Sequence, residues 1–158
     1  MLLRPLPLLC CLSLGLGALA SSTGAFALDD GHGGASEGVR VETLARGNRS
    51  WDGNLLPPYP GGQPEVTVLR ITIPAGVALA RHHHPVINAG MLIQGQLEVV
   101  SDKGETRTLR AGDGLIEMVN RIHHGRSVGP GPAVIVVVYA GAVGMPITVR
   151  ESPTNSGL

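Results

Sequence analysis

The sequence has little cysteine, few aromatic residues and no excess of either charge. Both cysteines, Cys10 and Cys11, lie near the amino terminus, so the rest of the chain offers neither a disulfide nor a thiolate ligand for a metal. Aromatic residues make up 3% of the chain, and 12 basic side chains balance 12 acidic ones. Without a long run of either charge, the sequence points to no nucleic acid and no anionic membrane as partner.

The amino-terminal segment predicts export. Arg4 precedes a leucine-rich apolar stretch over residues 6–20, which is too short to span a bilayer. Small residues follow at Ala20 and again at Ala27, an order that is typical of a secretory signal peptide. We therefore expect residues 1–27 to be a signal peptide that is cleaved after Ala20 or Ala27. The mature protein would be periplasmic or extracellular, with no insertion in a membrane.

The remaining chain divides into a flexible leader over 28–38, one folded domain over 39–150 and a tail over 151–158. The leader is small, polar and rich in glycine. In the domain, short β-branched runs such as residues 65–73 alternate with turn signals, and no helical periodicity is present. Two further runs flank a glycine within residues 91–100, which predicts a hairpin. Regularly spaced strands of this size indicate an all-β sandwich or barrel.

A strand over Val134–Val138 is apolar at every position, so we expect both of its faces to be covered. One face would meet the barrel core, and the other would meet either a second sheet or another subunit. An open sheet edge would likewise leave unpaired backbone in water. These features predict a homodimer or a higher oligomer.

A long segment over residues 50–64 has neither a strand nor a helix pattern and is rich in proline. It holds Trp51 and Tyr59, two of the few aromatic residues in the chain. A loop of this length in a compact domain is either functional or packs across an open end of the fold. We favour the second reading, a stiff cover over the barrel.

Five of the six histidines gather in two short clusters, His82 to His84 and the pair His123 and His124. On a β-strand, residues two apart point to the same face, so His82 and His84 can aim at one point while His83 faces away. A third imidazole, from His123 or from His124, would complete a face of three nitrogens for a divalent transition metal. The pattern therefore predicts a metal site.

The first cluster resembles a motif of the cupin superfamily. That motif is Gly, five residues, His, one residue, His, three or four residues, Glu, six residues, Gly. The positions that match it are Gly76, His82, His84 and Gly95, with Asn88 where the glutamate belongs. The departure at Asn88 removes the carboxylate that the motif would bring to the metal.

The second cluster resembles the other cupin motif, which is Gly, five residues, Pro, one, Gly, two, His, three, Asn. Gly112 and His123 match, while Met118, Asn120 and Ser127 replace the Pro, Gly and Asn. The resemblance implies a cupin double-stranded β-helix, an all-β jelly-roll barrel with a metal inside its mouth. It also implies that His82, His84 and His123 are the ligands, with His124 outside this set.

Asn88 changes the charge of the implied site. Three neutral imidazoles and, at most, a weak amide oxygen leave the metal's charge uncompensated, which favours an anionic or enolisable oxygen ligand. Glu117, six residues before His123, either points inward and compensates or is an exposed or ion-paired side chain. Arg121 is a candidate contact for a carboxylate of the ligand, and His124 is a candidate supporting residue.

Two classes of function fit these features. The first is a metalloenzyme that acts on a small oxygenated molecule, a carboxylate or an enolate, by dioxygenase, isomerase or lyase chemistry. Three histidines leave up to three positions open on an octahedral metal, as that chemistry requires. The alternative is a non-catalytic cupin module that binds or senses a metal or a small ligand. Iron, manganese, zinc and nickel all suit three imidazoles.

Overall fold

The computed structural model describes residues 38–152, so the predicted signal peptide, the leader up to residue 37 and the tail from residue 153 lie outside the described residues. From Arg40 to the last described residue the chain forms one compact unit. Residues 38–152 contain no helix that is long and apolar enough to cross a membrane.

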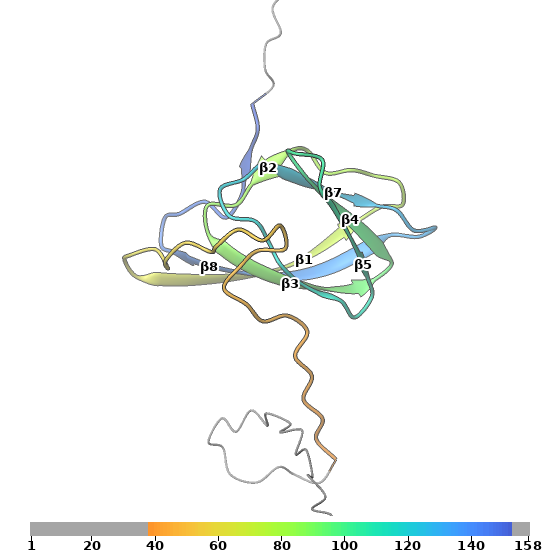
Figure 1. The fold of residues 1–158 in the computed structure, drawn as a ribbon, viewed down its shortest axis with the longest axis horizontal. Helices are drawn as coiled ribbons and strands as arrows, with labels where there is room; N and C mark the ends of the chain where they lie inside the picture. Colours follow the sequence, from red (N-terminus) through yellow and green to blue (C-terminus); the bar gives the residue numbers. More distant parts are fainter. Residues whose placement is uncertain (1–37, 153–158) are drawn as a thin grey trace, which may run out of the picture. The chain divides into compact units, whose positions relative to one another are not determined.

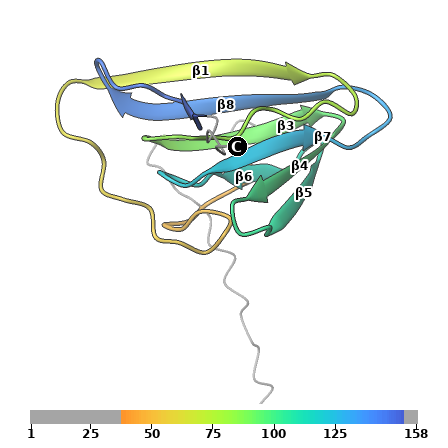
Figure 2. The same cartoon turned by 90° about the horizontal axis from the view of Figure 1, so that it is seen from above.

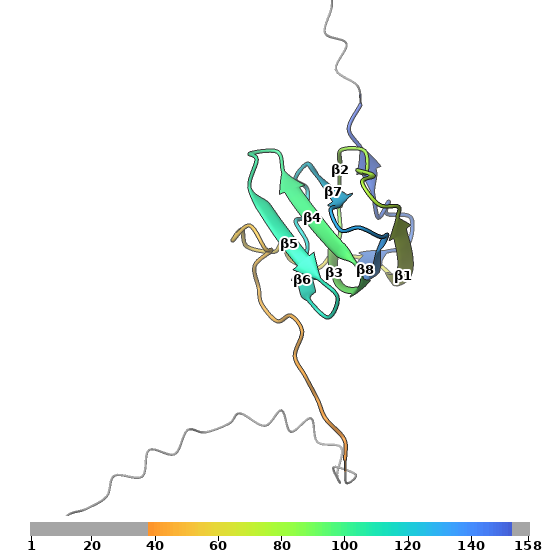
Figure 3. The same cartoon turned by 90° about the vertical axis from the view of Figure 1, so that its right-hand side faces the viewer.

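Antiparallel strands in two sheets make up this unit. One sheet has the strand order β1-β8-β3-β6 and the other the order β5-β4-β7-β2-β9, and the two lie face to face (Figure 1, Figure 3). The strands are β1 (Pro64–Ile73), β2 (His82–His83), β3 (Ile87–Gln94), β4 (Gln96–Ser101), β5 (Thr106–Arg110), β6 (Gly114–Ile116), β7 (His123–Ser127), β8 (Ala133–Ala142) and β9 (Val149–Arg150).

Strands that are distant in sequence pair with one another. β1 and β8 run side by side along their whole length, from the pair Pro64 and Ala142 to the pair Ile73 and Ala133 (Figure 2). Consecutive strands such as β1, β2, β3 and β4 belong alternately to the two sheets, so the chain crosses repeatedly from one sheet to the other. This arrangement is a double-stranded β-helix, and it confirms the all-β jelly-roll barrel expected from the sequence.

The core lies between the two sheets and follows the period of two that strands impose. In β4, Leu97 and Val99 are buried, while Gln96, Glu98 and Val100, which alternate with them, are half-buried. Inward-facing side chains of both sheets meet in one cluster. It comprises Ile73, Val86, Leu92, Leu97, Val99, Leu109, Leu115, Ala133, Ile135, Val137 and Tyr139.

The hairpin expected around Gly95 is wrong. β3 ends at Gln94 and β4 begins at Gln96, but the two strands lie in different sheets. Gly95 instead turns the chain from one sheet to the other, with a φ of 78°. A Cβ at this position would lie 2.3 Å from the carbonyl oxygen of Pro132, so only glycine fits this corner. Apolar runs around a glycine show where the chain turns, but not which strand the next one pairs with.

The outer face of the four-stranded sheet carries exposed valines. Val138 of β8 is 42% exposed, and its register partner Val68 is 61% exposed beside Val66 at 65%. The second sheet covers only the inner face of β8, where Val137 is buried. The second sheet thus leaves Val138 on the outer face exposed, and the homodimer stays a prediction.

If the exposed valines Val66, Val68 and Val138 form the dimer interface, Val68→Glu should yield a monomer, because a charge in an apolar interface is desolvated without a partner. Sedimentation at micromolar concentration measures this directly, with about twice the monomer mass expected for the unchanged protein. Thr108→Glu, an exposed β-branched position on the other sheet, is the matched control and should leave the mass unchanged. A monomeric unchanged protein would contradict the prediction.

Candidate metal centre

Three imidazoles converge between the sheets. His82 on β2 lies directly opposite His123 on β7 in the strand register, and His84 lies two residues further along the chain. The three ring centroids are 4.7 to 5.0 Å apart, and one ligand atom of each residue lies within 4.8 Å of the other two. All three side chains are buried. The structure thus brings together the three histidines that the sequence singles out.

A main-chain carbonyl oxygen orients each of these rings. The Nδ1 atoms of His82, His84 and His123 lie 2.7, 2.7 and 2.8 Å from the carbonyl oxygens of Ala80, Ile147 and Arg121, respectively. A carbonyl oxygen only accepts hydrogen bonds, so each Nδ1 carries the proton and each Nε2 keeps its lone pair. The Nε2 of His123 is buried and has no hydrogen-bond partner among the described residues. This unpaired nitrogen and its two neighbours form a donor set that fits a transition metal.

Burial keeps the three imidazoles neutral. It lowers the pKa of His84 to about 3, and it also lowers the pKa values of His82 and His123. Two charged imidazoles at this distance would repel each other, which further opposes protonation of more than one ring. Neutral imidazole is the form that binds a metal, so the site is prepared for ligation at physiological pH.

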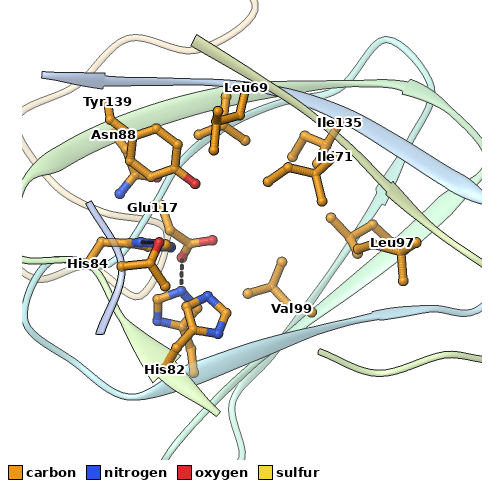
Figure 4. Close-up of a pocket in the computed structure, with 15 residues that line it drawn as sticks. Leu69, Ile71, His82, His84, Asn88, Leu97, Val99, Glu117, Ile135 and Tyr139 are labelled. Carbon is orange, nitrogen blue, oxygen red and sulfur yellow. Dashed lines mark hydrogen bonds and ion pairs between the residues drawn. The ribbon is translucent and has the colours of Figure 1, made fainter. Parts of the chain in front are cut away.

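Glu117 points into the same cavity (Figure 4). Its Oε1 lies 3.9 Å from the Nε2 of His123 and accepts hydrogen bonds from Trp51 Nε1, at 2.7 Å, and from the amide of Met118, at 2.8 Å. Burial raises the pKa of this carboxyl group. Of the two alternatives left open by the sequence, the structure shows the inward-pointing one.

Asn88 also lines the cavity and is 2% exposed. Its Nδ2 donates to the carbonyl oxygen of Val86 at 3.3 Å, which leaves the amide oxygen as the atom that could approach a metal. Direct ligation by Asn88 stays a prediction. Tyr139 of β8 is its register partner, and the Tyr139 ring lies 5.3 Å from that of His84.

The other candidate residues lie elsewhere. Arg121 pairs at 2.8 Å with Asp52, whose side chain is fully buried, and it does not line the cavity. His83 and His124 occupy the alternate positions of β2 and β7, which strand geometry turns to the outer face of the sheet. A ligand contact by Arg121 and a supporting role of His124 stay predictions.

Asn120 occupies a position at which the second cupin motif has glycine. Its φ of 55° lies in the left-handed region, which asparagine tolerates better than most residues with a side chain. Its amide donates to the carbonyl oxygen of His84 at 2.8 Å. The substitution therefore keeps the backbone that ties the loop before β7 to a candidate ligand.

The cavity has a volume of about 170 Å³ and two chemically different ends (Figure 4). The histidines, Glu117, Asn88 and Tyr139 form one end, and aliphatic side chains form the other. No arginine or lysine is among the described residues that line it. A ligand inside would meet the candidate metal position at one end and hydrocarbon at the other.

Sequence reasoning missed two residues of the site, Trp51 and Tyr139. Trp51 packs against the core and reaches Glu117, whereas Tyr59 of the same segment is 76% exposed. Trp51 could have been recognised as the single tryptophan of the sequence, placed in a long irregular segment. Tyr139 was recognisable as the one residue with a polar side-chain atom in an apolar strand, two positions after the inward-facing Val137.

Comparison with known proteins shows what the chain is similar to. A family described as "Cupin domain" matches residues 69–139, the interval that includes the three histidines, Asn88 and Glu117. No curated protein matches the chain.

Among solved structures, the chain is similar to the DMSP lyase DddQ from Ruegeria pomeroyi, with 21% identity, a TM-score of 0.50, and coverage of 56% of this chain and 44% of that one. An oxalate oxidase in complex with the substrate analogue glycolate shares 27% identity, with a TM-score of 0.47 and coverage of 54% and 45%. An uncharacterized conserved protein with a double-stranded β-helix domain from Klebsiella pneumoniae shares 22% identity, with a TM-score of 0.48 and coverage of 72% and 98%. The chain spans less than half the length of the lyase and of the oxidase.

Acidification should destabilise the metal-free protein. The unfolded chain binds protons on its histidines below pH 6.5, whereas folded His84 stays neutral down to about pH 3. In that window His84 lowers the free energy of unfolding by about 1.4 kcal/mol per pH unit, and the lowered pKa values of His82 and His123 act in the same direction. The raised pKa of Glu117 acts in the opposite sense as the pH falls towards 4.5 and partly offsets this loss.

Urea denaturation of the metal-free protein at pH 7, 6 and 5 measures this loss of stability. The His84→Gln variant serves as control and should show a shallower dependence on pH, because one of the groups is gone. Stability that stays level or rises between pH 7 and pH 5 would show that the three imidazoles are not held neutral.

Proposed function

Since this chain belongs to the cupin superfamily, we propose that it is a metalloenzyme with a divalent transition metal on His82, His84 and His123. The observation that carries the proposal is the convergence of three buried, neutral imidazoles whose Nδ1 atoms are all engaged by carbonyl oxygens. The unpartnered Nε2 of His123 supports it, because a buried polar atom without a partner is costly unless something binds it.

A divalent metal bound there would act as a Lewis acid on a coordinated oxygen. The three imidazoles occupy one side of the site and bring no negative charge, so the open side favours an anionic oxygen donor. A small carboxylate or enolate meets this requirement, and dioxygenase, isomerase or lyase chemistry fits such a molecule. Tyr139 is a side chain of the cavity that can hold or move a proton.

The apolar end of the cavity restricts the rest of the substrate. Its walls are aliphatic and come from β1, β4 and β8, namely Leu69, Ile71, Leu97, Val99, Ile135 and Val137. A hydroxyl group placed there would lose its hydrogen bonds to water without replacement. An engineered cavity of about 150 Å³ holds benzene, so the cavity admits a molecule of roughly six to eight heavy atoms. A chelating head with a short aliphatic remainder fits best.

Removing a ligand should abolish stoichiometric metal binding. His82→Ala should weaken the affinity for a divalent metal by more than about 100-fold, the upper range for residues that merely support a ligand. His83→Ala is the matched control on the opposite face of the same strand and should change the affinity little. Calorimetric titration of the metal-free protein measures both variants. Equal losses in the two would show that the imidazoles do not converge as described.

Ligand binding should depend on the metal and on the aliphatic remainder. The branched 2-oxo acid 3-methyl-2-oxobutanoate should bind the metal-loaded protein at least about tenfold more tightly than a neutral tetrose with the same number of heavy atoms. Calorimetric titrations of the metal-loaded and metal-free forms give the comparison. The same affinity in both forms would show that binding does not go through the metal. Tight binding without turnover of any such acid would favour the non-catalytic module.

A further inference from the structure

Asn88 stands where the resembled motif has a glutamate, so the candidate metal centre lacks that carboxylate. In the structure, the carboxylate of Glu117 lies beside Asn88. The register of β3 and β6 pairs Ala89 with Ile116, and its continuation sets Asn88 opposite Glu117. The amide of Glu117 donates to the carbonyl oxygen of Asn88 at 3.0 Å. Opposite residues of an antiparallel pair present their side chains on the same face. Asn88 and Glu117 accordingly both line the cavity.

One oxygen of Glu117 is fixed and the other is free. Both of its hydrogen bonds, from Trp51 Nε1 and from the amide of Met118, end on Oε1. No described residue donates a hydrogen bond to Oε2. Oε1 lies 3.9 Å from the Nε2 of His123. The carboxylate is therefore anchored beside one of the three candidate ligands, close enough to share a metal ion with it.

The charges of the site also favour a contact between the carboxylate of Glu117 and a metal ion on the three histidines. Glu117 is the one acidic residue among the described residues that line the cavity, and no arginine or lysine lines it. The nearest arginine of the following segment, Arg121, is paired with the buried Asp52. A buried carboxylate without a cationic partner is costly, and so is a divalent cation held by neutral imidazoles alone. Each charge compensates the other.

We propose that Glu117 supplies the carboxylate oxygen that position 88 lacks, as the fourth protein ligand of the metal, and that Trp51 positions it. This inference rests on the proposed metal site of His82, His84 and His123. The acidic ligand has moved from β3 to the adjacent position across the sheet, at the end of β6. Trp51, whose own amide donates to the carbonyl oxygen of Ile116 at 3.0 Å, holds the carboxylate from the segment outside the barrel.

The test compares Mn²⁺ and Zn²⁺ binding in four proteins: the unchanged chain, Glu117→Gln, Asn88→Glu and the double variant. Mn²⁺ depends on oxygen donors more than Zn²⁺ does. Glu117→Gln should therefore weaken Mn²⁺ binding by about 100-fold and Zn²⁺ binding by less. Asn88→Glu should recover at least about tenfold in the Glu117→Gln background, and should add little in the unchanged chain, where two carboxylates would face each other.

Matched controls separate this inference from the metal site itself. Glu98→Gln removes a carboxylate that pairs with Arg126 outside the cavity and should leave both affinities unchanged. If His82→Ala abolishes binding and Glu117→Gln does not weaken Mn²⁺ binding, the role of Glu117 is wrong and the metal site stands. If His82→Ala and the unchanged chain bind alike, the metal site is wrong.

Trp51→Phe tests the positioning role. It removes the indole N–H and keeps an aromatic ring, so it should weaken Mn²⁺ binding severalfold in the unchanged chain. In the Glu117→Gln background it should cause no further loss, because the group it positions is no longer a carboxylate. An equal loss in both backgrounds would show that Trp51 acts on the fold and not through Glu117.

Thermal unfolding of the metal-free Glu117→Gln variant should give a Tm no lower than that of the unchanged chain. A lower Tm with unchanged Mn²⁺ affinity would make Glu117 a structural residue and overturn the inference.

Discussion

Three imidazoles buried with their Nε2 lone pairs turned towards one another are the constraint on which this structure depends. Left without a cation, three such lone pairs repel, and that of His123 has no hydrogen-bond partner within residues 38–152. Main-chain carbonyl oxygens nevertheless hold all three rings in place through Nδ1. The backbone of the barrel thus maintains an arrangement that is unfavourable by itself and favourable around a metal.

The strand pairing of the jelly roll brings the three imidazoles together. The pairing of β2 with β7 sets His82 opposite His123, and the return of the chain through Ile147 supplies the carbonyl oxygen that orients His84. The same inward faces continue as aliphatic side chains of β1, β4 and β8, so one cavity combines a polar end with an apolar one. Burial keeps the imidazoles neutral and raises the pKa of the inward carboxyl group of Glu117, so that its charged form is disfavoured without a nearby cation.

The parts of the account that follow short sequence patterns could be predicted. Alternation along a strand places His82 and His84 on one face, and the motif spacing selects His123 over His124. Features set by contacts between distant segments could not be predicted. Trp51 and Glu117 are 66 residues apart in the sequence, and nothing local links them. Gly95 was recognised as a turn, but its role as a corner between sheets depends on Pro132, which packs against it in the fold.

The most direct test of the account is a crystal structure of the metal-loaded protein with anomalous data collected at the absorption edge of the metal. The account predicts one strong anomalous peak per chain, bonded to the Nε2 atoms of His82, His84 and His123 at about 2.1 Å. A peak on the outer face of the sheet at His83 or His124, with none between the three buried imidazoles, would contradict it.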